Sequence, residues 1–208
     1  MSLLRTGEHF TADSRDPILL SWAAAGNLVA PSVLPEYAAA CLVARPAEGS
    51  GLGVFMRDGC TAHHGATLAA YWGHLCRDPD PASAYLLDVP VARLGDGTTS
   101  IFIDARRQCC RPTPPPTHAG LINHACEDPS CAPYLLRLPG CPMPVVSIRT
   151  RRSLRGGTEL TYNYDSHLRS GAYTVGAEEA AFLLSAGEPC VPCRCAAPLP
   201  CPQRRFFT

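Results

Sequence analysis

An asparagine–histidine pair and two later tyrosines are the residues of this chain whose types and spacing could do chemistry. Asn123-His124 is followed closely by Cys126, and Tyr162 and Tyr164 lie in the segment Glu-Leu-Thr-Tyr-Asn-Tyr. An amide, an imidazole and two phenols can bind a polar ligand and orient a reacting amine without a strong base. Two structural alternatives remain open. A buried Asn-His pair can simply tie loops together, and strand tyrosines are commonly half-buried packing residues.

Glycines earlier in the chain suit a bulky nucleotide ligand. Gly51 and Gly53 flank Leu52 and precede Val54, and Tyr71 opens the triplet Tyr-Trp-Gly. Residues without a Cβ let backbone carbonyls and amides approach a ligand, and carbonyls suit the cationic sulfur of a sulfonium compound. The alternative interpretation of a lone Gly-x-Gly is a turn between two strands.

Four separated segments, in this order, resemble the SET family of protein lysine methyltransferases. They are Gly51-Leu52-Gly53-Val54-Phe55 with Tyr71-Trp72-Gly73; Ile103-Asp104-Ala105 with Leu121-Ile122-Asn123-His124-Ala125-Cys126; the segment 155–165, which reads Arg-Gly-Gly-Thr-Glu-Leu-Thr-Tyr-Asn-Tyr-Asp; and Cys193-Arg194-Cys195 with Cys201. The most specific part is Asn-His-x-Cys followed later by Glu-Leu-Thr-Tyr-x-Tyr.

The resemblance implies methyl transfer from S-adenosylmethionine to a protein lysine. It makes Tyr164 the catalytic tyrosine and places Tyr162 where Tyr or Phe sets the number of methyl groups, with tyrosine typical of mono-methylation. Tyr71 completes the catalytic set as a wall of the lysine channel. The residues expected to bind the cofactor are Gly51, Leu52, Gly53, Val54, Tyr71, Asn123, His124 and Tyr164. The expected substrate is a histone tail, and the expected location is intracellular, in the nucleus or on chromatin.

Cysteines at the C-terminus predict a zinc site. The chain has 12 cysteines, and its N-terminus is unlike a signal peptide, which favours reduced thiols and metal over disulfides. Cys193, Cys195 and Cys201 supply three thiolates, and a tetrahedral zinc takes four ligands. In the SET family the fourth is the cysteine of Asn-His-x-Cys, so the resemblance implies Cys126. Cys190 lies close enough in sequence to replace one of them, and a frayed tail of free thiols is the alternative.

Composition restricts the class of protein. Hydrophobic residues make up 46% of the chain and charged residues 17%, which is enough for one packed core. A formal net charge of zero argues against strong, nonspecific nucleic-acid binding. No apolar run reaches the ~20 residues that a membrane-spanning helix needs, so no membrane partner is expected.

Short apolar runs separated by Gly, Pro and Asp are expected to position these groups. The expected strands cover residues 41–45, 54–56, 67–71, 84–89, 100–103, 134–138, 145–150 and 159–164. A helix is expected over 18–25, ended by Gly26-Asn27, and another over 176–186. Because Tyr162 and Tyr164 alternate on the last strand, they face opposite sides unless the chain bends.

The sequence therefore predicts a mostly β, β-rich α+β chain with the SET fold: several small sheets, a knot-like C-terminal crossing and a cysteine-rich zinc tail. Residues 1–36 are the N-terminal flank, 37–175 the SET domain, and 176–208 a C-terminal helix and post-SET zinc tail. A catalytically silent SET-like module is the main alternative. It is favoured by Gly120 and Leu121, which stand in place of the family's usual aromatic residue and arginine, and by Ser130, which replaces asparagine. A zinc-stabilised interaction domain is a further alternative, which bound S-adenosylmethionine would exclude.

Overall fold

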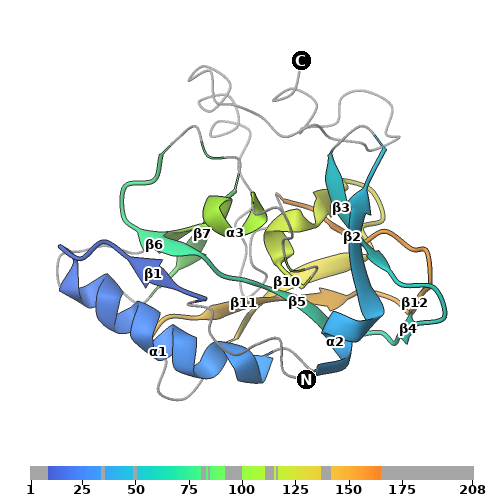
Figure 1. Cartoon of the computed structure of the whole chain (residues 1–208), viewed down its shortest axis with the longest axis horizontal. Coiled ribbons are helices and arrows are strands. Elements are labelled where there is room, and N and C mark those ends of the chain that lie inside the picture. The colour runs from blue at the N-terminus through green and yellow to red at the C-terminus, as the bar shows by residue number, and fades with distance from the viewer. Residues whose placement is uncertain are drawn as a thin grey trace.

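Strands dominate the structure, a computed structural model that describes residues 9–33, 36–48, 51–80, 83, 85–91, 100–110, 115, 117–136 and 142–164. They form one four-stranded, one three-stranded and three two-stranded sheets in this part of the chain (Figure 1). The prediction of a mostly β chain of several small sheets is confirmed. The predicted helix over 176–186 and the cysteine-rich tail lie outside the described residues.

A three-stranded antiparallel sheet carries Tyr71. Its order is β10-β11-β5, with β10 at Cys131–Leu136, β11 at Val145–Thr150 and β5 at Thr67–Tyr71. Nearly every residue of β11 and β5 is buried, because both faces of this part of the sheet are covered, so continuous apolar runs replace alternation. Val146 pairs with Tyr71, which fixes the tyrosine at the end of β5.

The four-stranded sheet packs beside it in the order β1-β6-β8-β7. Its strands are β1 (Thr11–Ala12), β6 (His74–Cys76), β8 (Ser100–Asp104) and β7 (Leu86–Pro90). Between β5 and β6 the chain passes so close to β8 that a Cβ on Gly73 would collide with the carbonyl oxygen of Asp104. The glycine of the Tyr-Trp-Gly triplet is therefore required by packing.

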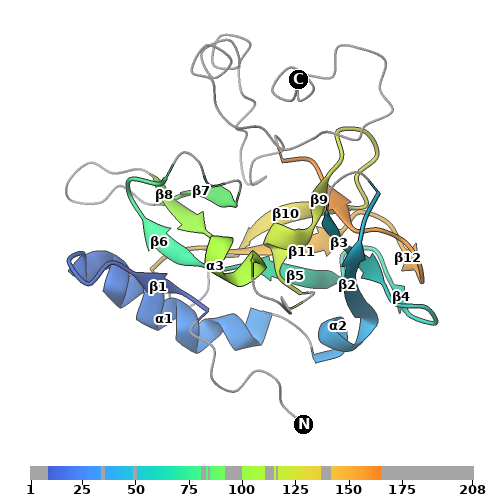
Figure 2. The ribbon, with the colours of Figure 1, turned by 45° about the horizontal axis from the view of Figure 1, so that its top comes forward.

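Three two-stranded sheets complete the β structure. They pair β2 (Leu42–Pro46) with β3 (Leu52–Met56), β4 (Thr61–Ala62) with β12 (Leu154–Arg155), and β9 (Asn123–His124) with β13 (Thr161–Tyr162). The last pair is parallel and joins segments far apart in the sequence. Figure 2 shows β9 close to β3, so the pieces of the predicted site meet in one region.

The helices are α1 (Pro17–Val33), α2 (Glu36–Cys41), α3 (Arg106–Cys109) and the short 3₁₀ helix η1 (Ala119–Leu121). The prediction that Gly26-Asn27 ends the first helix is wrong. Gly26 packs against the Phe10 ring, where an added Cβ would lie 2.7 Å from Cδ2, and the Asn27 amide bonds both backbone groups of Phe10. These tertiary contacts outweigh the local tendency of Gly-Asn to end a helix.

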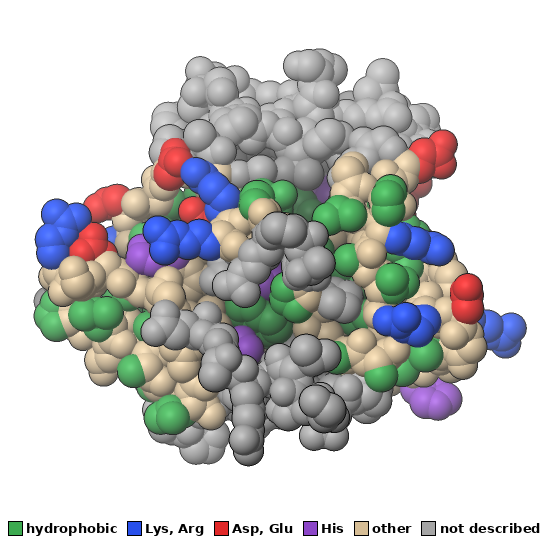
Figure 3. Space-filling view, in the orientation of Figure 1, with side chains coloured by type: hydrophobic (Ala, Val, Ile, Leu, Met, Phe, Trp, Pro, Cys, Tyr) green, Lys and Arg blue, Asp and Glu red, His purple; other side chains and the backbone are tan. Residues whose placement is uncertain are grey.

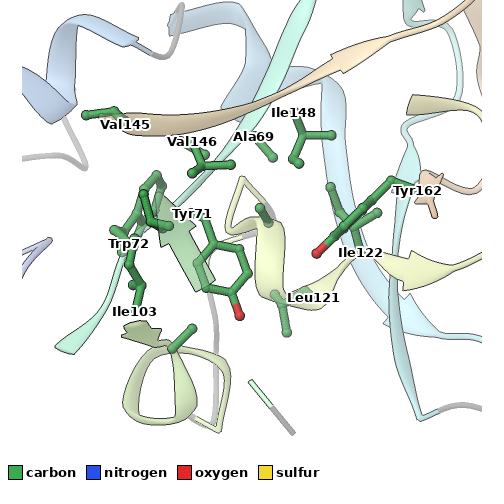
Figure 4. Packing of buried hydrophobic residues seen from close by; sticks show 14 of the residues in the cluster. Ala69, Tyr71, Trp72, Ile103, Leu121, Ile122, Val145, Val146, Ile148 and Tyr162 are labelled. Atoms are coloured by element: carbon green, nitrogen blue, oxygen red, sulfur yellow. The ribbon is translucent and has the colours of Figure 1, made fainter. Parts of the chain in front are cut away.

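One apolar core joins these elements. Phe10, Leu19 and Trp22 from the N-terminal part share it with residues of β5, β8 and β11. Figure 4 shows Tyr71 and Tyr162 among its members, beside Leu121 and Ile122. None of the helices in the described part of the chain is long and apolar enough to cross a bilayer.

Candidate active site

The Asn-His pair lies directly beside the tyrosine segment. β9 and β13 run parallel, with Asn123 opposite Thr161 and His124 opposite Tyr162. The backbone amide of Ala125 extends the pairing by donating to the carbonyl of Tyr162 at 3.1 Å. The two segments that the sequence marks as most specific therefore form one small sheet.

Strand β3 adds the Gly-x-Gly segment to the same site. Its Val54 carbonyl accepts from Leu160 N, and its Met56 amide donates to Thr158 O, both at 2.8 Å. The residue between these two, Glu159, forms an isolated bridge with Phe55. Segments from three distant parts of the sequence thus lie side by side around residues 158–162.

A polar pair crosses the backbone of β3 at its glycine. Asn123 Nδ2 donates to Glu159 Oε1 at 2.8 Å and also approaches the carbonyl of Leu52 at 3.4 Å. A Cβ on Gly53 would lie 2.7 Å from that Nδ2 and 2.8 Å from that Oε1. Glycine is therefore needed at position 53 so that the Asn123–Glu159 pair can pack against the strand. Because both acceptors face Nδ2, the amide is fixed in one orientation.

The start of β3 leaves room for a ligand. Gly51 has φ +74°, and nothing lies within 4 Å of the position that a Cβ on it would occupy. Leu52 is 42% exposed, whereas the next residues, Gly53 and Val54, are buried. Gly51 and Leu52, at the start of β3, are thus exposed next to the Asn123 amide. This combination fits a ligand that binds through backbone groups.

Tyr164 turns back onto the Asn-His segment. Its amide donates to Nδ1 of His124 at 3.0 Å, and its hydroxyl donates to the carbonyl of Ile122 at 2.8 Å. The pairing with β9 ends at Tyr162, so strict alternation no longer applies beyond that residue. As a result the rings of Tyr162 and Tyr164 lie on the same side, with centroids 4.8 Å apart.

The three predicted site tyrosines differ in what their hydroxyls bind. Tyr71 donates to the carbonyl of Tyr85 at 2.7 Å and Tyr164 donates to Ile122, whereas no hydrogen bond of the Tyr162 hydroxyl is found within the described residues. Tyr71 is 3% and Tyr162 is 7% exposed. In Figure 4 both side chains extend into the space beside Leu121. The hydroxyl of Tyr162 is therefore the one most available to a ligand.

Burial keeps these phenols neutral. It raises the pKa of Tyr71 well above its usual value, and the neighbouring Tyr162 is the next cause. Burial likewise raises the pKa of Tyr164 well above its usual value, again with Tyr162 as the next cause. It also raises the pKa of Tyr162, with Cys109 as a smaller cause. The site is thus a cluster of uncharged hydroxyls, and none of them ionises at neutral pH.

Packing explains why glycine stands at position 120, where the sequence departs from the SET pattern. A Cβ there would lie 2.7 Å from Sγ of Cys109 and 3.2 Å from Nδ1 of His118, so no larger side chain fits. His118 is fully buried, accepts from Gly120 N at 3.0 Å, and binds the carbonyl of Trp72 through Nε2 at 2.9 Å. His118 and Cys109 thus fill the space beside Gly120 and brace the loop after Tyr71.

Cys126 is the only predicted zinc ligand within the described residues. It is half-buried, and its Sγ lies 2.9 Å from Nε2 of His124. Cys193, Cys195, Cys201 and the possible substitute Cys190 lie outside the part that the structure describes. Within that part, no group of three or more His, Cys, Asp or Glu side chains could hold a metal ion. The thiol suits zinc chemically, but the four-ligand set stays a prediction.

A separate cavity of about 620 Å³ lies at β1 and β6. Two of its carboxylates form ion pairs within the lining: Asp13 with Arg15, and Asp16 with Arg77, each at 2.8 Å. Figure 3 shows blue and red side chains close together on this side of the molecule. None of the predicted site residues lines this cavity, and its lining carries more aspartates than arginines.

The structure brings together most of the predicted site residues. The residues of β3, Asn123, His124, Tyr162 and Tyr164 meet around residues 158–162. Tyr71 belongs to the same buried cluster as Tyr162. Sequence reasoning did not assign roles to Glu159, Ser130 or His118. The available signals were Glu159, a charged residue inside an expected strand, and Ser130, which stands where the SET family usually has asparagine. Ser130 and His118 act mainly through backbone atoms of other segments, which no motif reveals.

Comparisons with known proteins give matches among solved structures alone. No protein-family model matches the chain, and no curated protein matches it. Among solved structures, one of KRYPTONITE in complex with mCHG DNA and SAH matches at 20% identity and a TM-score of 0.44, over 62% of this chain and 24% of that chain. One of ATXR5 in complex with histone H3.1 mono-methylated on an arginine matches at 15% identity and a TM-score of 0.45, over 79% and 71%. This chain spans about a quarter of the KRYPTONITE chain. A likeness of this degree shows no function. The proposed function therefore rests on the residues of the site.

Proposed function

We propose that this chain is a SET-type protein lysine methyltransferase that uses S-adenosylmethionine and mono-methylates a lysine, with histone tails as the substrate and the nucleus or chromatin as its location. The observation that carries this proposal is the convergence of β3, β9 and the segment 158–164, which places Gly53, Asn123, His124 and Tyr164 in one site.

The residues at the start of β3 fit the cofactor. Open space at Gly51, the exposed residue Leu52 and the oriented amide of Asn123 form a surface for a polar nucleotide ligand. When bound, S-adenosylmethionine supplies its methyl group as an electrophile on a sulfonium sulfur. The chain's own task is then to hold and orient the two partners.

The tyrosine cluster suits an amine that must lose its proton. A lysine with a pKa near 10.4 must give up a proton at a cost of roughly 4–5 kcal/mol at neutral pH before it can attack. Buried rings disfavour the ammonium form and lower that cost. Because burial raises the pKa of Tyr164, its hydroxyl does not serve as an ionised base.

Tyr164 acts as an acceptor in this proposal. Its hydroxyl proton is engaged with the carbonyl of Ile122, so its oxygen lone pairs are left to accept a hydrogen bond from the substrate amine. The hydroxyl of Tyr162, 7% exposed as a residue and without a partner among the described residues, would hold a water or the amine and limit the room for further methyl groups. This supports mono-methylation.

Zinc is proposed to bind Cys126 together with Cys193, Cys195 and Cys201, with Cys190 as a possible replacement. The support from the described residues is Cys126 itself, a half-buried thiol next to the His124 ring. A metal held there would tie the C-terminal residues to the site.

Transfer of labelled methyl from S-adenosylmethionine to core histones tests the proposal. We expect label on lysine with the wild-type protein and a loss of about 100-fold or more in Tyr164→Phe, which keeps the ring but loses the oriented oxygen. Tyr134→Phe, at a tyrosine that is 39% exposed on β10, is the matched control and should leave transfer unchanged.

The possible failures have different meanings. Binding of S-adenosylmethionine without transfer to histones or to other protein extracts would favour a catalytically silent SET-like module. Absence of cofactor binding would favour a zinc-stabilised interaction domain. Transfer that is unaffected in Tyr164→Phe would show that the catalytic assignment is wrong.

A further inference from the structure

The segment 158–162 is bonded along both of its edges. In a strand the backbone groups of alternate residues point to opposite edges. Thr158 and Leu160 bond to β3, each at 2.8 Å, and Tyr162 accepts from the chain just after β9 at 3.1 Å. One edge of the segment is therefore covered by two neighbouring strands.

Ser130 covers the other edge. Its Oγ accepts from Thr161 N at 2.8 Å and donates to Glu159 O at 3.1 Å. Its own amide donates to Oγ1 of Thr161 at 3.2 Å. Ser130 is only 2% exposed, so water cannot replace these bonds. One serine side chain thus makes the backbone hydrogen bonds that a neighbouring strand makes elsewhere in a sheet.

This serine is anchored on the sheet that carries Tyr71. Its carbonyl accepts from Arg151 N at 2.9 Å, and the next residue, Cys131, begins β10 opposite Thr150 of β11. Strand β5, which ends at Tyr71, pairs with the other edge of β11. Ser130 therefore links the sheet of Tyr71 to the segment that ends in Tyr162 and Tyr164.

We propose that Ser130 is a positioning residue, which sets the separation between Tyr71 and the Tyr162–Tyr164 pair by clamping the free edge of the segment 158–162. The proposal rests on the proposed methyltransferase function. Asparagine is usual at this position in the SET family, and its replacement was a reason to expect a silent module. The bonds of Ser130 show that serine already satisfies both backbone groups on that edge.

Amide hydrogen exchange tests the clamp without any activity. In Ser130→Ala, the Thr161 amide loses its acceptor, so its exchange should become faster by about tenfold or more. The amide of Ala125, which bonds Tyr162 from the opposite edge, is the internal reference and should change far less. Equal protection of Thr161 in both proteins would overturn the clamp.

Kinetics test the positioning role. We expect kcat for methyl transfer to fall about 10-fold to 100-fold in Ser130→Ala, since displaced catalytic groups cost that much, while KM for S-adenosylmethionine changes by less than about threefold. Ser153→Ala, at an exposed serine, is the control and should match the wild type. An unchanged kcat, or a loss that appears only in KM, would overturn the proposal.

A second variant covers the case in which Ser130→Ala does not fold. Thr161→Val removes only the bond from the Ser130 amide and keeps the shape of the side chain. It should show a smaller fall in kcat with the same unchanged KM, and wild-type turnover would count against the proposal. A wild-type protein that transfers no methyl would overturn the proposed function, whereas amide exchange would still decide whether the clamp exists.

Discussion

The backbone amide of Tyr164 donates to Nδ1 of His124 at 3.0 Å, and this bond decides the tautomer of the imidazole. Because Nδ1 accepts, the ring proton of the neutral histidine lies on Nε2, which is 2.9 Å from Sγ of Cys126. One ring therefore connects the backbone of the proposed catalytic tyrosine to a proposed zinc ligand. An N–H donor of this kind orients a thiolate toward its metal.

Zinc content should depend on both Cys126 and His124. Cys126→Ser should lose most of its zinc, because a hydroxyl is a poor substitute for a thiolate. His124→Phe keeps the thiolate but removes its donor, so zinc affinity should fall about 10-fold to 100-fold. Metal analysis after dialysis and competition with a chromophoric chelator measure the two effects.

Cys110→Ser is the control for these variants, since Cys110 is exposed and is not among the proposed ligands. It should bind zinc like the wild type. If Cys126→Ser retains its zinc in full, Cys190 is the better candidate for the fourth ligand. If His124→Phe binds zinc as tightly as the wild type, the imidazole does not support the thiolate.

The number of methyl groups should depend on the hydroxyl of Tyr162. Tyr162→Phe removes an oxygen for which the described residues provide no partner, so stability should change by less than about 1 kcal/mol. The freed space should admit an amine that already carries a methyl group. Mass spectra of the substrate peptide should then show di- and tri-methylated lysine in place of mono-methylated lysine.

Tyr164→Phe distinguishes this effect from a general disturbance of the cluster. It should lower the total transfer without increasing the number of methyl groups per lysine. A product that stays mono-methylated in Tyr162→Phe would rule out the proposed role of this hydroxyl.

Local patterns predicted much of the β structure. The bounds of β5 and β11 agree with the predicted strands 67–71 and 145–150. In β11 the β-branched residues Val145, Val146, Ile148 and Thr150 favour a strand by themselves. The last strand, predicted over 159–164, is paired as a ladder only at Thr161–Tyr162. Its other backbone bonds go to β3 and to the side chain of Ser130, whose positions depend on the complete fold.

The sequence predicted which residues belong to the site better than it predicted which of them contact one another. The family resemblance named Asn123, but its amide is oriented by Glu159 from a distant segment. The two tyrosines lie on one side because Tyr164 bonds to His124 and Ile122. Such long-range hydrogen bonds leave no periodic signal in a sequence, and neither does the packing that carries α1 through Gly26-Asn27.

Cofactor binding should be sensitive to one added methyl group at position 53. In Gly53→Ala the new Cβ would lie 2.7 Å from Asn123 Nδ2 and 2.8 Å from both Glu159 Oε1 and the Cβ of Ala47. Crowding of this kind costs about 1–3 kcal/mol, so affinity for S-adenosylhomocysteine should fall roughly 10-fold to 100-fold. Titration calorimetry measures this directly.

A double variant separates the contributors to that crowding. Ala47→Gly removes one of the three close contacts and leaves the Asn123–Glu159 pair displaced. Gly53→Ala with Ala47→Gly should therefore bind as weakly as Gly53→Ala alone. Restored affinity in the double variant would mean that Ala47, and not the polar pair, is responsible.

Stability should fall steeply in alkaline solution because of the buried tyrosines. Burial raises the pKa of Tyr71 and of Tyr162 in the folded protein, whereas in the unfolded chain tyrosine titrates near pH 10. Above about pH 10 the unfolded state binds fewer protons than the folded state, so the free energy of unfolding falls as pH rises. The slope is about 1.4 kcal/mol per pH unit for each such tyrosine, and below pH 10 these groups add no pH dependence. Cys109, whose pKa burial raises to about 12, acts in the same direction.

Urea unfolding at pH values between about 8 and 11, where the tyrosines of the unfolded chain titrate, measures how the free energy of unfolding changes with pH. Ultraviolet absorbance follows phenolate formation in the same samples. Tyr162→Phe should reduce the pH dependence of stability by about one proton. Tyr134→Phe, at a tyrosine that is 39% exposed, should leave it unchanged. Because the buried phenols can ionise only when the cluster opens, their phenolate signal should appear together with unfolding. Phenolate formation by Tyr71 and Tyr162 well before unfolding, or a stability that stays constant above pH 10, would show that these rings are accessible to water in the folded protein.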